Sequence, residues 1–189
     1  MNPIERVFNA VLTAVFGLVR ALFGGMARAP ITAVQQQIQG VDIRRATAHE
    51  LLDLRHRVLR QGRPRDTAHM DGDGHARTRH WIAKNGDDVI GGVSLMQTPW
   101  PATEPAPFDP APQHQLRGMA TAPAWRGKGV GAALLAVLER EADAPLWCNA
   151  RTGARGFYAK HGWVVVGEPF EIPDVGPHVR MVRELTASE

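Results

Sequence analysis

A glycine-rich turn between a predicted strand and a predicted helix constrains the fold of this chain more than any other feature. It reads Arg126-Gly127-Lys128-Gly129-Val130-Gly131. Glycine lets the backbone turn sharply and lets a ligand approach closely, because no Cβ is in the way. The free amides and the dipole of a helix start favour a phosphate, and Arg126 and Lys128 add positive charge. The turn therefore predicts a cradle for a pyrophosphate group.

Two common phosphate-binding motifs do not account for this turn. In a P-loop the lysine is followed by serine or threonine, whereas Gly129 follows Lys128 here. A dinucleotide fold needs an acidic residue at the end of the next strand, about 20 residues on, whereas that strand ends in Cys148 and Asn149. Too few elements follow for a doubly wound fold, so a dinucleotide enzyme ranks last among the functions considered.

The elements around the turn predict a mixed α/β sheet. Thr47 and Glu50 form a capping box that starts a helix, and Asn85-Gly86 joins two strands. Residues 99–112 are too rich in proline for a helix or an inner strand. The expected order is a strand at 41–44, a helix ended by Gly62 and Pro64, strands at 80–84, 89–97 and 114–121, a helix at 130–141, a strand at 146–149, a helix at 152–161, and strands at 164–170 and 178–185.

Composition excludes several classes of protein. The length of 189 residues suits one domain with an added segment. The formal charge of +3 is mild and the basic residues are interspersed with acidic ones, so no nucleic acid is expected as a partner. Cys148 is the one cysteine, which rules out an internal disulfide and favours a reducing, cytoplasmic location. The acidic segment 71–74 fails the register of a calcium loop, so we expect no metal there and interpret it as a flexible turn near the substrate.

Residues 1–30 differ from the rest and predict an amphipathic helix. A transmembrane span needs about 20 apolar residues in a row, and Arg20 interrupts this run. A signal peptide that ends at 27–29 is less favoured, because Glu5 weakens its positive start. The helix is expected to pack on its own domain, on another copy of the chain, or peripherally on a membrane surface. The glutamine-rich residues 31–40 form a predicted linker.

Two motifs resemble the GNAT superfamily of N-acetyltransferases. The coenzyme A signature of that family is glutamine or arginine, two residues, glycine, one residue, and glycine or alanine, which residues 126–131 fit in full. The segment Phe157-Tyr158-Ala159-Lys160-His161-Gly162-Trp163 resembles the second motif, in which phenylalanine usually stands at the position of Trp163. Residues 146–151 and 177–181 resemble a small bacterial branch of the family. The resemblance covers residues 41–189, which we expect to form one GNAT domain.

The resemblance implies the acyl-CoA N-acyltransferase fold, a mixed central sheet flanked by helices, and direct transfer of an acetyl group from acetyl-coenzyme A to an amine. Tyr158 would contact the cofactor and protonate the leaving thiolate, which is reasonable for a phenol with a pKa near 10. The backbone of Met119, Ala120 and Thr121 would pair with the pantetheine arm, and Asn149 would also contact the cofactor. The glycine-rich turn would hold the pyrophosphate through Arg126, Gly127, Lys128, Gly129, Val130 and Gly131.

The amine acceptor must lose a proton before it attacks the thioester. His114 and His178 are the candidate bases, since imidazole titrates near neutral pH. Glu168 and Glu171 are further options. Cys148 lies in an apolar strand, where a cysteine is usually inert packing, so no covalent enzyme intermediate is expected.

A second hypothesis stays open beside the enzyme. Many relatives carry asparagine seven positions before the tyrosine, whereas Arg151 stands there in this chain. A non-catalytic module that binds coenzyme A, a protein partner or a membrane would tolerate this departure. The intact glycine-rich turn and Tyr158 favour the enzyme, whose acceptor is expected to be a small molecule or a peptide with an amine.

We predict that residues 1–30 are dispensable for the chemistry and mediate attachment or assembly. An amphipathic helix does not stay solvated alone, because each large apolar side chain gains roughly 1.5–3 kcal/mol when it is fully buried. A chain that begins at Gln39 should stay folded and bind acetyl-coenzyme A, but change its oligomeric state or lose binding to liposomes. Light scattering, liposome sedimentation and calorimetry on both chains measure this. The prediction is wrong if the shortened chain is insoluble while the full chain is a monomer that does not bind liposomes. That result would place the helix in the core of its own domain.

Overall fold

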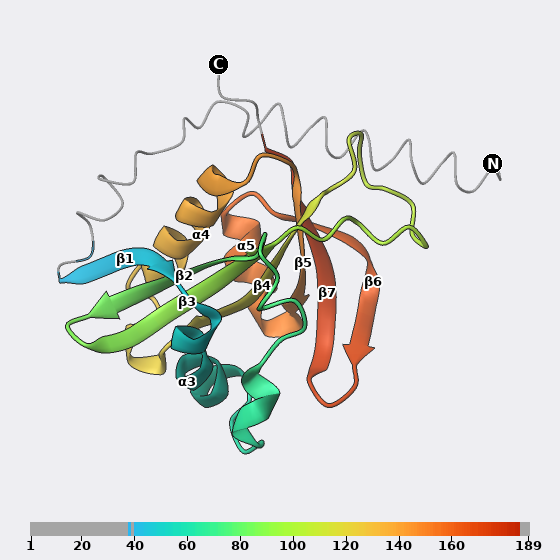
Figure 1. Cartoon of the computed structure of the whole chain (residues 1–189). Helices are drawn as coiled ribbons and strands as arrows, with labels where there is room; N and C mark the ends of the chain where they lie inside the picture. The colour runs from blue at the N-terminus through green and yellow to red at the C-terminus, as the bar shows by residue number, and fades with distance from the viewer. Residues whose placement is uncertain (1–37, 39, 186–189) are drawn as a thin grey trace, which may run out of the picture. The chain divides into compact units, whose positions relative to one another are not determined.

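The computed structural model describes residue 38 and residues 40–185 (Figure 1). The predicted helix 1–30 and most of the predicted linker lie outside this part, so both stay predictions. The chain forms two compact units. We call the unit that holds Arg28–Thr98 and His114–Asp143 the cradle unit, and the unit that holds Pro99–Gln113 and the chain from Ala144 the hairpin unit. No helix within the described ranges is long and apolar enough to cross a bilayer.

Four antiparallel strands form the sheet of the cradle unit, in the order β1-β2-β3-β4. The predicted hairpin is confirmed, because β2 and β3 pair on either side of a turn in which Gly86 has a φ of +58°. The predicted strand at 114–121 is also confirmed. The strands are β1 (Val41–Ala46), β2 (Arg79–Asn85), β3 (Asp88–Met96) and β4 (His114–Thr121).

Helices α3 (Ala48–Leu59) and α4 (Val130–Glu141) cover opposite faces of this sheet (Figure 1). Two consecutive glycines of β3 show this, since neighbouring residues of a strand point to opposite faces. A Cβ on Gly91 would lie 2.7 Å from Val130 of α4, and one on Gly92 would clash with Leu51 of α3. The glycines therefore let both helices approach the sheet closely.

The predicted capping box starts α3. The Thr47 amide donates a hydrogen bond to Glu50 Oε2 at 2.9 Å, and Arg44 Nη2 donates to Glu50 Oε1 at 2.7 Å. The Arg44 hydrogen bond, with that of Thr47, lowers the pKa of Glu50 to about 2. The helix start that the sequence predicts is thus confirmed, and it holds the end of β1 beside α3.

Arg55 is the only charged residue among those described, histidine aside, that the structure buries, and its exposed fraction is 0%. Its guanidinium donates to both Asp73 carboxylate oxygens, at 2.5 and 3.1 Å, and to Ser94 Oγ at 2.7 Å. His80 contacts Ser94 Oγ through Nδ1 at 2.6 Å and the Asp73 carbonyl through Nε2 at 3.0 Å. Because a carbonyl only accepts, Nε2 carries a proton, and the neutral ring accepts at Nδ1 from the Ser94 hydroxyl. Sequence reasoning missed this network and interpreted 71–74 as a flexible turn, whereas Asp73 is anchored to α3.

The hairpin unit contains three antiparallel strands in the order β5-β7-β6. The strand predicted at 146–149 extends further, as β5 (Leu146–Arg151), and the others are β6 (Val164–Ile172) and β7 (Gly176–Arg183). The helix predicted at 152–161 divides into the 3-10 turn η3 (Thr152–Ala154) and α5 (Arg155–Lys160). The proline-rich segment is a loop, as predicted, and its Phe108 and Ala111 pack on a core cluster of Trp100, Trp147, Val166 and Val182.

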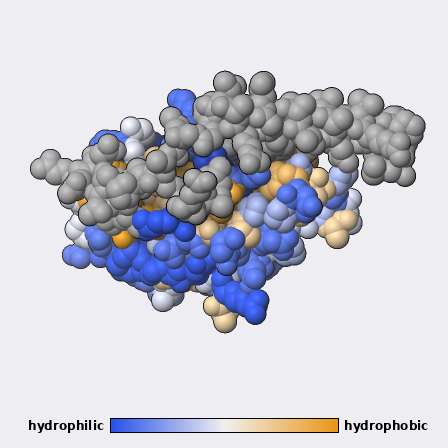
Figure 2. All heavy atoms as spheres, turned by 90° about the horizontal axis from the view of Figure 1, so that it is seen from above, coloured by the Kyte–Doolittle hydropathy of each residue, from blue (hydrophilic) through white to orange (hydrophobic). Residues whose placement is uncertain are grey.

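Hydrophilic side chains dominate the face drawn in Figure 2, and hydrophobic ones form smaller patches among them. The buried residues are mostly aliphatic or aromatic, and Leu51, Ile82, Leu134 and Met181 are each fully buried. Buried apolar side chains therefore stabilise each unit in the ordinary way, and the burial of Arg55 is the exception that needs its own partners.

We predict that Arg55→Met destabilises the protein by about 3–5 kcal/mol, because it leaves the Asp73 carboxylate without its partner in a largely buried place. Arg65→Met is the matched control, since Arg65 pairs with Asp53 on the surface. The control should cost under about 1 kcal/mol. Urea unfolding followed by circular dichroism measures both free energies of unfolding. Equal losses in the two variants would contradict the importance of the buried network.

Candidate functional site

A β-bulge interrupts β4 just before the backbone that is predicted to bind pantetheine. Gly92 pairs with Ala120 and Ser94 pairs with Arg117, so two residues of β4, Gly118 and Met119, lie opposite one residue of β3. Gly118 has a φ of +60°, and a Cβ there would lie 2.8 Å from Arg55 Nε. The bulge therefore needs glycine for two reasons, the backbone conformation and the buried guanidinium. A glycine inside a predicted strand was the signal that could have revealed it.

The glycine-rich turn links β4 to α4 through the short 3-10 turn η2 (Pro123–Trp125). Gly127 has a φ of +74°, and Gly129, the N-cap of α4, has a φ of +87°. The Arg126 amide donates to the Pro123 carbonyl at 3.2 Å, so it is engaged inside the turn. Within the described ranges, the amides of 127–131 donate to no backbone carbonyl. Residues 127–129 are exposed and Gly131 is partly exposed, whereas Val130 is fully buried, so the amides of 127–129 and 131 form the part of the predicted cradle that is open to a ligand.

Two basic side chains flank these amides. Lys128 is exposed, and its Nζ lies 5.1 Å from the ring centroid of Trp125. The Arg126 Nε lies 3.4 Å from the Thr121 carbonyl oxygen, which joins the turn to the end of β4. Open amides, glycines with positive φ and two cations fit a diphosphate group, which is anionic and rich in acceptors. We call residues 126–131 the cradle.

Tyr158 lies on α5 of the hairpin unit and is 6% exposed. Its ring packs at 5.1 Å from Phe157 and at 5.5 Å from Trp163, centroid to centroid. Burial raises the pKa of the Tyr158 phenol well above 10, and the neighbouring Cys148 adds to the shift. Burial likewise raises the pKa of Cys148, so its thiol stays protonated, in keeping with the packing role expected for it.

His178 lies on β7, on the other side of the hairpin-unit sheet from Tyr158. Tyr158 lies near Cys148, which contributes to the raised pKa of Tyr158. Cys148 and Asn149 are consecutive residues of β5, so their side chains point to opposite faces of the sheet. Asn149 pairs with Arg180 of β7, and His178 shares the face of Arg180 because it is two residues away. The His178 Nδ1 lies 2.7 Å from the Gly176 carbonyl oxygen. The proton on the neutral ring is therefore at Nδ1, and Nε2 has the free lone pair that a general base needs.

The structure places His114 differently. It begins β4, seven residues before Thr121, which is about 23 Å along a strand. Its Nε2 lies 2.5 Å from Asp143 Oδ1, just after the end of α4, and this hydrogen bond is the main cause that lowers the pKa of Asp143. His114 thus sits at the end of the cradle unit away from the cradle. This position favours a structural role, and catalysis by His114 stays an untested prediction.

Asn149 is engaged by a residue that sequence reasoning missed. Its Oδ1 accepts a hydrogen bond from Arg180 Nε at 3.3 Å. Glu168 and Glu171, the further candidate bases, are exposed on β6. The predicted site residues thus form two groups, each within one unit: β4 with the cradle, and Tyr158, His178 and Asn149 around the β5–β7 pair.

The chain is similar to known acetyltransferases in sequence. A family model described as an acetyltransferase (GNAT) domain matches residues 76–165. The uncharacterized N-acetyltransferase YitI of Bacillus subtilis (strain 168) is 29% identical over 152 residues, a match that covers 78% of this chain and 99% of the relative.

Solved structures show the same fold. An acyl-CoA N-acyltransferase from Pseudomonas aeruginosa matches with a TM-score of 0.53 and 21% identity, over 76% of this chain and 99% of that one. An aminoglycoside 6'-N-acetyltransferase complexed with coenzyme A matches with a TM-score of 0.58 and 13% identity, over 78% of this chain and 99% of that one. These matches confirm the expected acyl-CoA N-acyltransferase fold, in which helices flank a mixed sheet.

We predict that Gly129→Asp weakens the binding of acetyl-coenzyme A at least about 10-fold, because a φ of +87° disfavours a side chain and a carboxylate repels the pyrophosphate. Gly74→Asp is the control, since Gly74 has open space around it and no positive φ. Isothermal titration of both variants, after a check of their melting temperatures, gives the comparison. Unchanged affinity in a folded Gly129→Asp variant would remove the cradle from the cofactor site.

Proposed function

Because the chain belongs to the GNAT superfamily of acyltransferases, we propose that it transfers an acetyl group from acetyl-coenzyme A to an amine. The observation that carries this proposal is the cradle, whose amides at 127–129 and 131 are open to a ligand beside Arg126 and Lys128. The similarity to a structure that contains coenzyme A supports the choice of ligand. A small molecule or peptide with a free amine is the proposed acceptor.

Different residues would bind the pyrophosphate and the pantetheine arm of acetyl-coenzyme A. The cradle would hold the pyrophosphate, with the Arg126 amide excluded because it closes the η2 turn. The backbone of Met119, Ala120 and Thr121 would hold the pantetheine arm, next to the bulge at Gly118. A bulge changes the direction of backbone groups locally, which suits a strand that must pair with a ligand as well as with its neighbour.

The reaction balances with one proton acceptor and one proton donor. The amine nitrogen forms a bond to the thioester carbonyl carbon, and the bond from that carbon to sulfur breaks. The amine proton would pass to His178 Nε2, whose lone pair is free while Nδ1 donates to the Gly176 carbonyl. The departing thiolate would take the proton of Tyr158. Burial keeps that phenol protonated through neutral pH, which is the state that a proton donor requires.

His178 is a better candidate base than His114 on geometric grounds. The Nε2 of His114 is already hydrogen-bonded to Asp143, and the residue lies at the far end of β4 from Thr121. Nothing in the described part of the chain engages Nε2 of His178 in the same way. A cytoplasmic location and attachment or assembly through residues 1–30 complete the proposal, and the shortened chain described above tests the second of these.

We predict that Tyr158→Phe lowers kcat by roughly 10²–10⁴-fold and leaves the affinity for acetyl-coenzyme A unchanged, because only the hydroxyl is lost. Thiol release measures kcat once an amine acceptor has been found. Trp163→Phe is the control, since it alters packing against the Tyr158 ring and should keep turnover within a few-fold. Deprotonation of Tyr158 should not lower the wild-type rate below pH 10, because the raised pKa keeps the phenol protonated there. A Tyr158→Phe enzyme with wild-type rates would make Tyr158 a core residue only.

A further inference from the structure

Arg180 occupies an unusual place on β7. Its strand neighbours Val179 and Met181 are buried on one face, and Arg180 projects from the other. The guanidinium carbon lies 5.3–5.6 Å from the ring centroids of Phe170, Trp100 and Trp147, and 15% of the side chain is exposed. Aromatic rings hold a guanidinium in place and remove water from it, which strengthens its attraction for an anion. We call Arg180 and these three rings the arginine cage.

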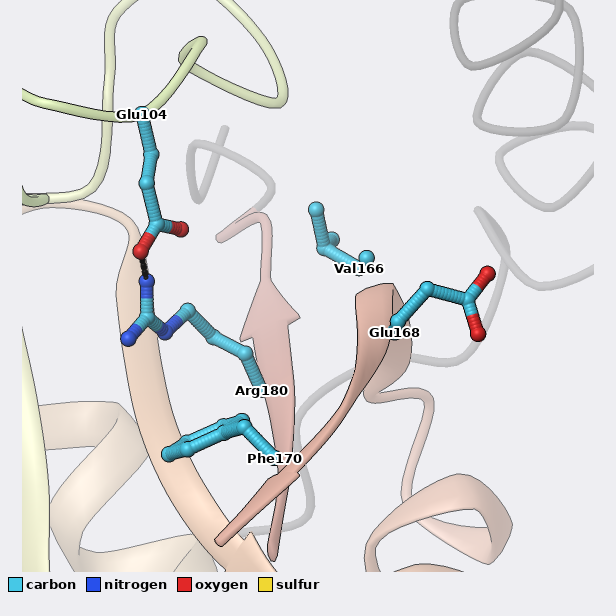
Figure 3. A pocket seen from close by; sticks show the side chains of 6 residues that line it. Glu104, Val166, Glu168, Phe170 and Arg180 are labelled. Carbon is cyan, nitrogen blue, oxygen red and sulfur yellow. Dashed lines mark ion pairs between the residues drawn. The ribbon is translucent and has the colours of Figure 1, made fainter.

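A carboxylate of the protein itself already occupies the cage. Glu104 forms an ion pair with Arg180 Nη1 (Figure 3). Asn149 Oδ1 accepts a hydrogen bond from Nε of the same guanidinium. Glu104 belongs to the proline-rich loop, where its amide donates to the Pro101 carbonyl at 3.0 Å. Its side chain is 43% exposed. The cage is thus a built carboxylate site whose present occupant faces solvent and can be exchanged.

An open hollow of about 360 Å³ adjoins the cage and is lined by Glu104, Val166, Gly167, Glu168, Phe170 and Arg180 (Figure 3). An irregularity in β6 creates it. Val166 pairs with Arg180 and Phe170 pairs with His178, so residues 167–169 have no regular place in the ladder. Gly167 has a φ of +73°, and Pro169 has no amide to donate. The hollow is therefore built into the backbone beside Arg180.

The hollow also adjoins the proposed base. His178 and Arg180 are two residues apart on one face of β7, about 7 Å along the strand. Phe170 contacts both, with centroid distances of 6.1 Å to the His178 ring and 5.3 Å to the guanidinium carbon. A ligand that binds Arg180 at one end therefore reaches the neighbourhood of His178 with its other end.

We infer that this hollow binds an acceptor amine that also carries a carboxylate, such as an amino acid or a peptide, with Arg180 as the carboxylate receptor. The inference rests on the proposed function, because it names the acceptor of that reaction. The lining has one cationic and two anionic side chains, which matches a zwitterion. The ligand carboxylate replaces Glu104 at Arg180, while Glu168 and the displaced Glu104 attract the positively charged amine end.

The first experiment measures binding to the full chain without acetyl-coenzyme A. Titrations followed by NMR compare the dipeptide alanyl-alanine, its C-terminal amide, and spermidine. Alanyl-alanine should bind at least about 10-fold more tightly than its amide, since a hydrogen-bonded charge pair is lost in the amide. Equal affinity for the two, or tighter binding of spermidine, would overturn the carboxylate assignment.

Variants then test whether the arginine cage causes the preference for alanyl-alanine over its amide. Arg180→Gln should abolish the preference for alanyl-alanine over its amide. Glu104→Gln should strengthen alanyl-alanine binding several-fold, because the internal competitor for Arg180 is removed. Asp109→Asn is the control, an exposed carboxylate of the same loop as Glu104 that does not line the hollow, and should change nothing. The opposite signs expected for Arg180→Gln and Glu104→Gln keep the test decisive even if one variant folds poorly. A preference that survives in a folded Arg180→Gln variant would overturn the inference.

Thiol release from acetyl-coenzyme A separates this inference from the proposed function. Turnover with other amines but no binding of alanyl-alanine would overturn the carboxylate subsite and leave the acetyltransferase intact. Arg180-dependent binding of alanyl-alanine with no thiol release from any amine would overturn the acetyltransferase and leave a carboxylate-binding site. If the protein has both the acetyltransferase activity and the carboxylate subsite, Arg180→Gln should raise KM for alanyl-alanine about 10-fold, without a matching rise for its amide.

Discussion

The burial of the Arg55 guanidinium is the interaction on which the cradle unit depends. A buried charge is costly unless it is paired, and here Asp73, from the segment before β2, and Ser94, from β3, accept hydrogen bonds from the two Nη atoms. The network therefore fastens separate parts of the chain to α3. The same guanidinium leaves no room for a side chain at position 118, where β4 bulges next to the backbone proposed to bind pantetheine. The bulge in β4 thus requires glycine at position 118, because a charged group is buried next to it.

Arg55 and Arg180 differ in how far they and their carboxylate partners are exposed to solvent. Arg55 is fully buried and donates to both oxygens of one carboxylate and to a hydroxyl, so it has no access to a ligand. Arg180 has a solvent-exposed carboxylate on one side and a hollow beside it. A guanidinium that is packed against aromatic rings and pairs with a solvent-exposed carboxylate is suited to recognition, whereas one that is fully buried with its carboxylate partner is suited to holding a fold.

The proposed acid and base lie on opposite faces of the sheet in the hairpin unit. Tyr158 is near Cys148, and His178 shares a face with Asn149, the next residue of β5. The attacking nitrogen and the leaving sulfur are bonded to the same carbon in acyl transfer, so each side chain can take its proposed role only if it reaches that carbon from its own face of the sheet. The roles of Tyr158 and His178 are therefore separate proposals.

Local patterns in the sequence were sufficient to predict most helices and strands and the glycine-rich turn that is proposed to bind the cofactor. The capping box at Thr47, the turn at Gly86 and the helix from Val130 each depend on neighbours within a few residues, so the sequence alone determined them. The cradle follows for the same reason, because its amides and glycines are contiguous. The Arg55–Asp73 pair and the Arg180–Glu104 pair join residues 18 and 76 positions apart. Only the tertiary structure decided these contacts, because no local pattern tells a buried, paired arginine from one that faces solvent.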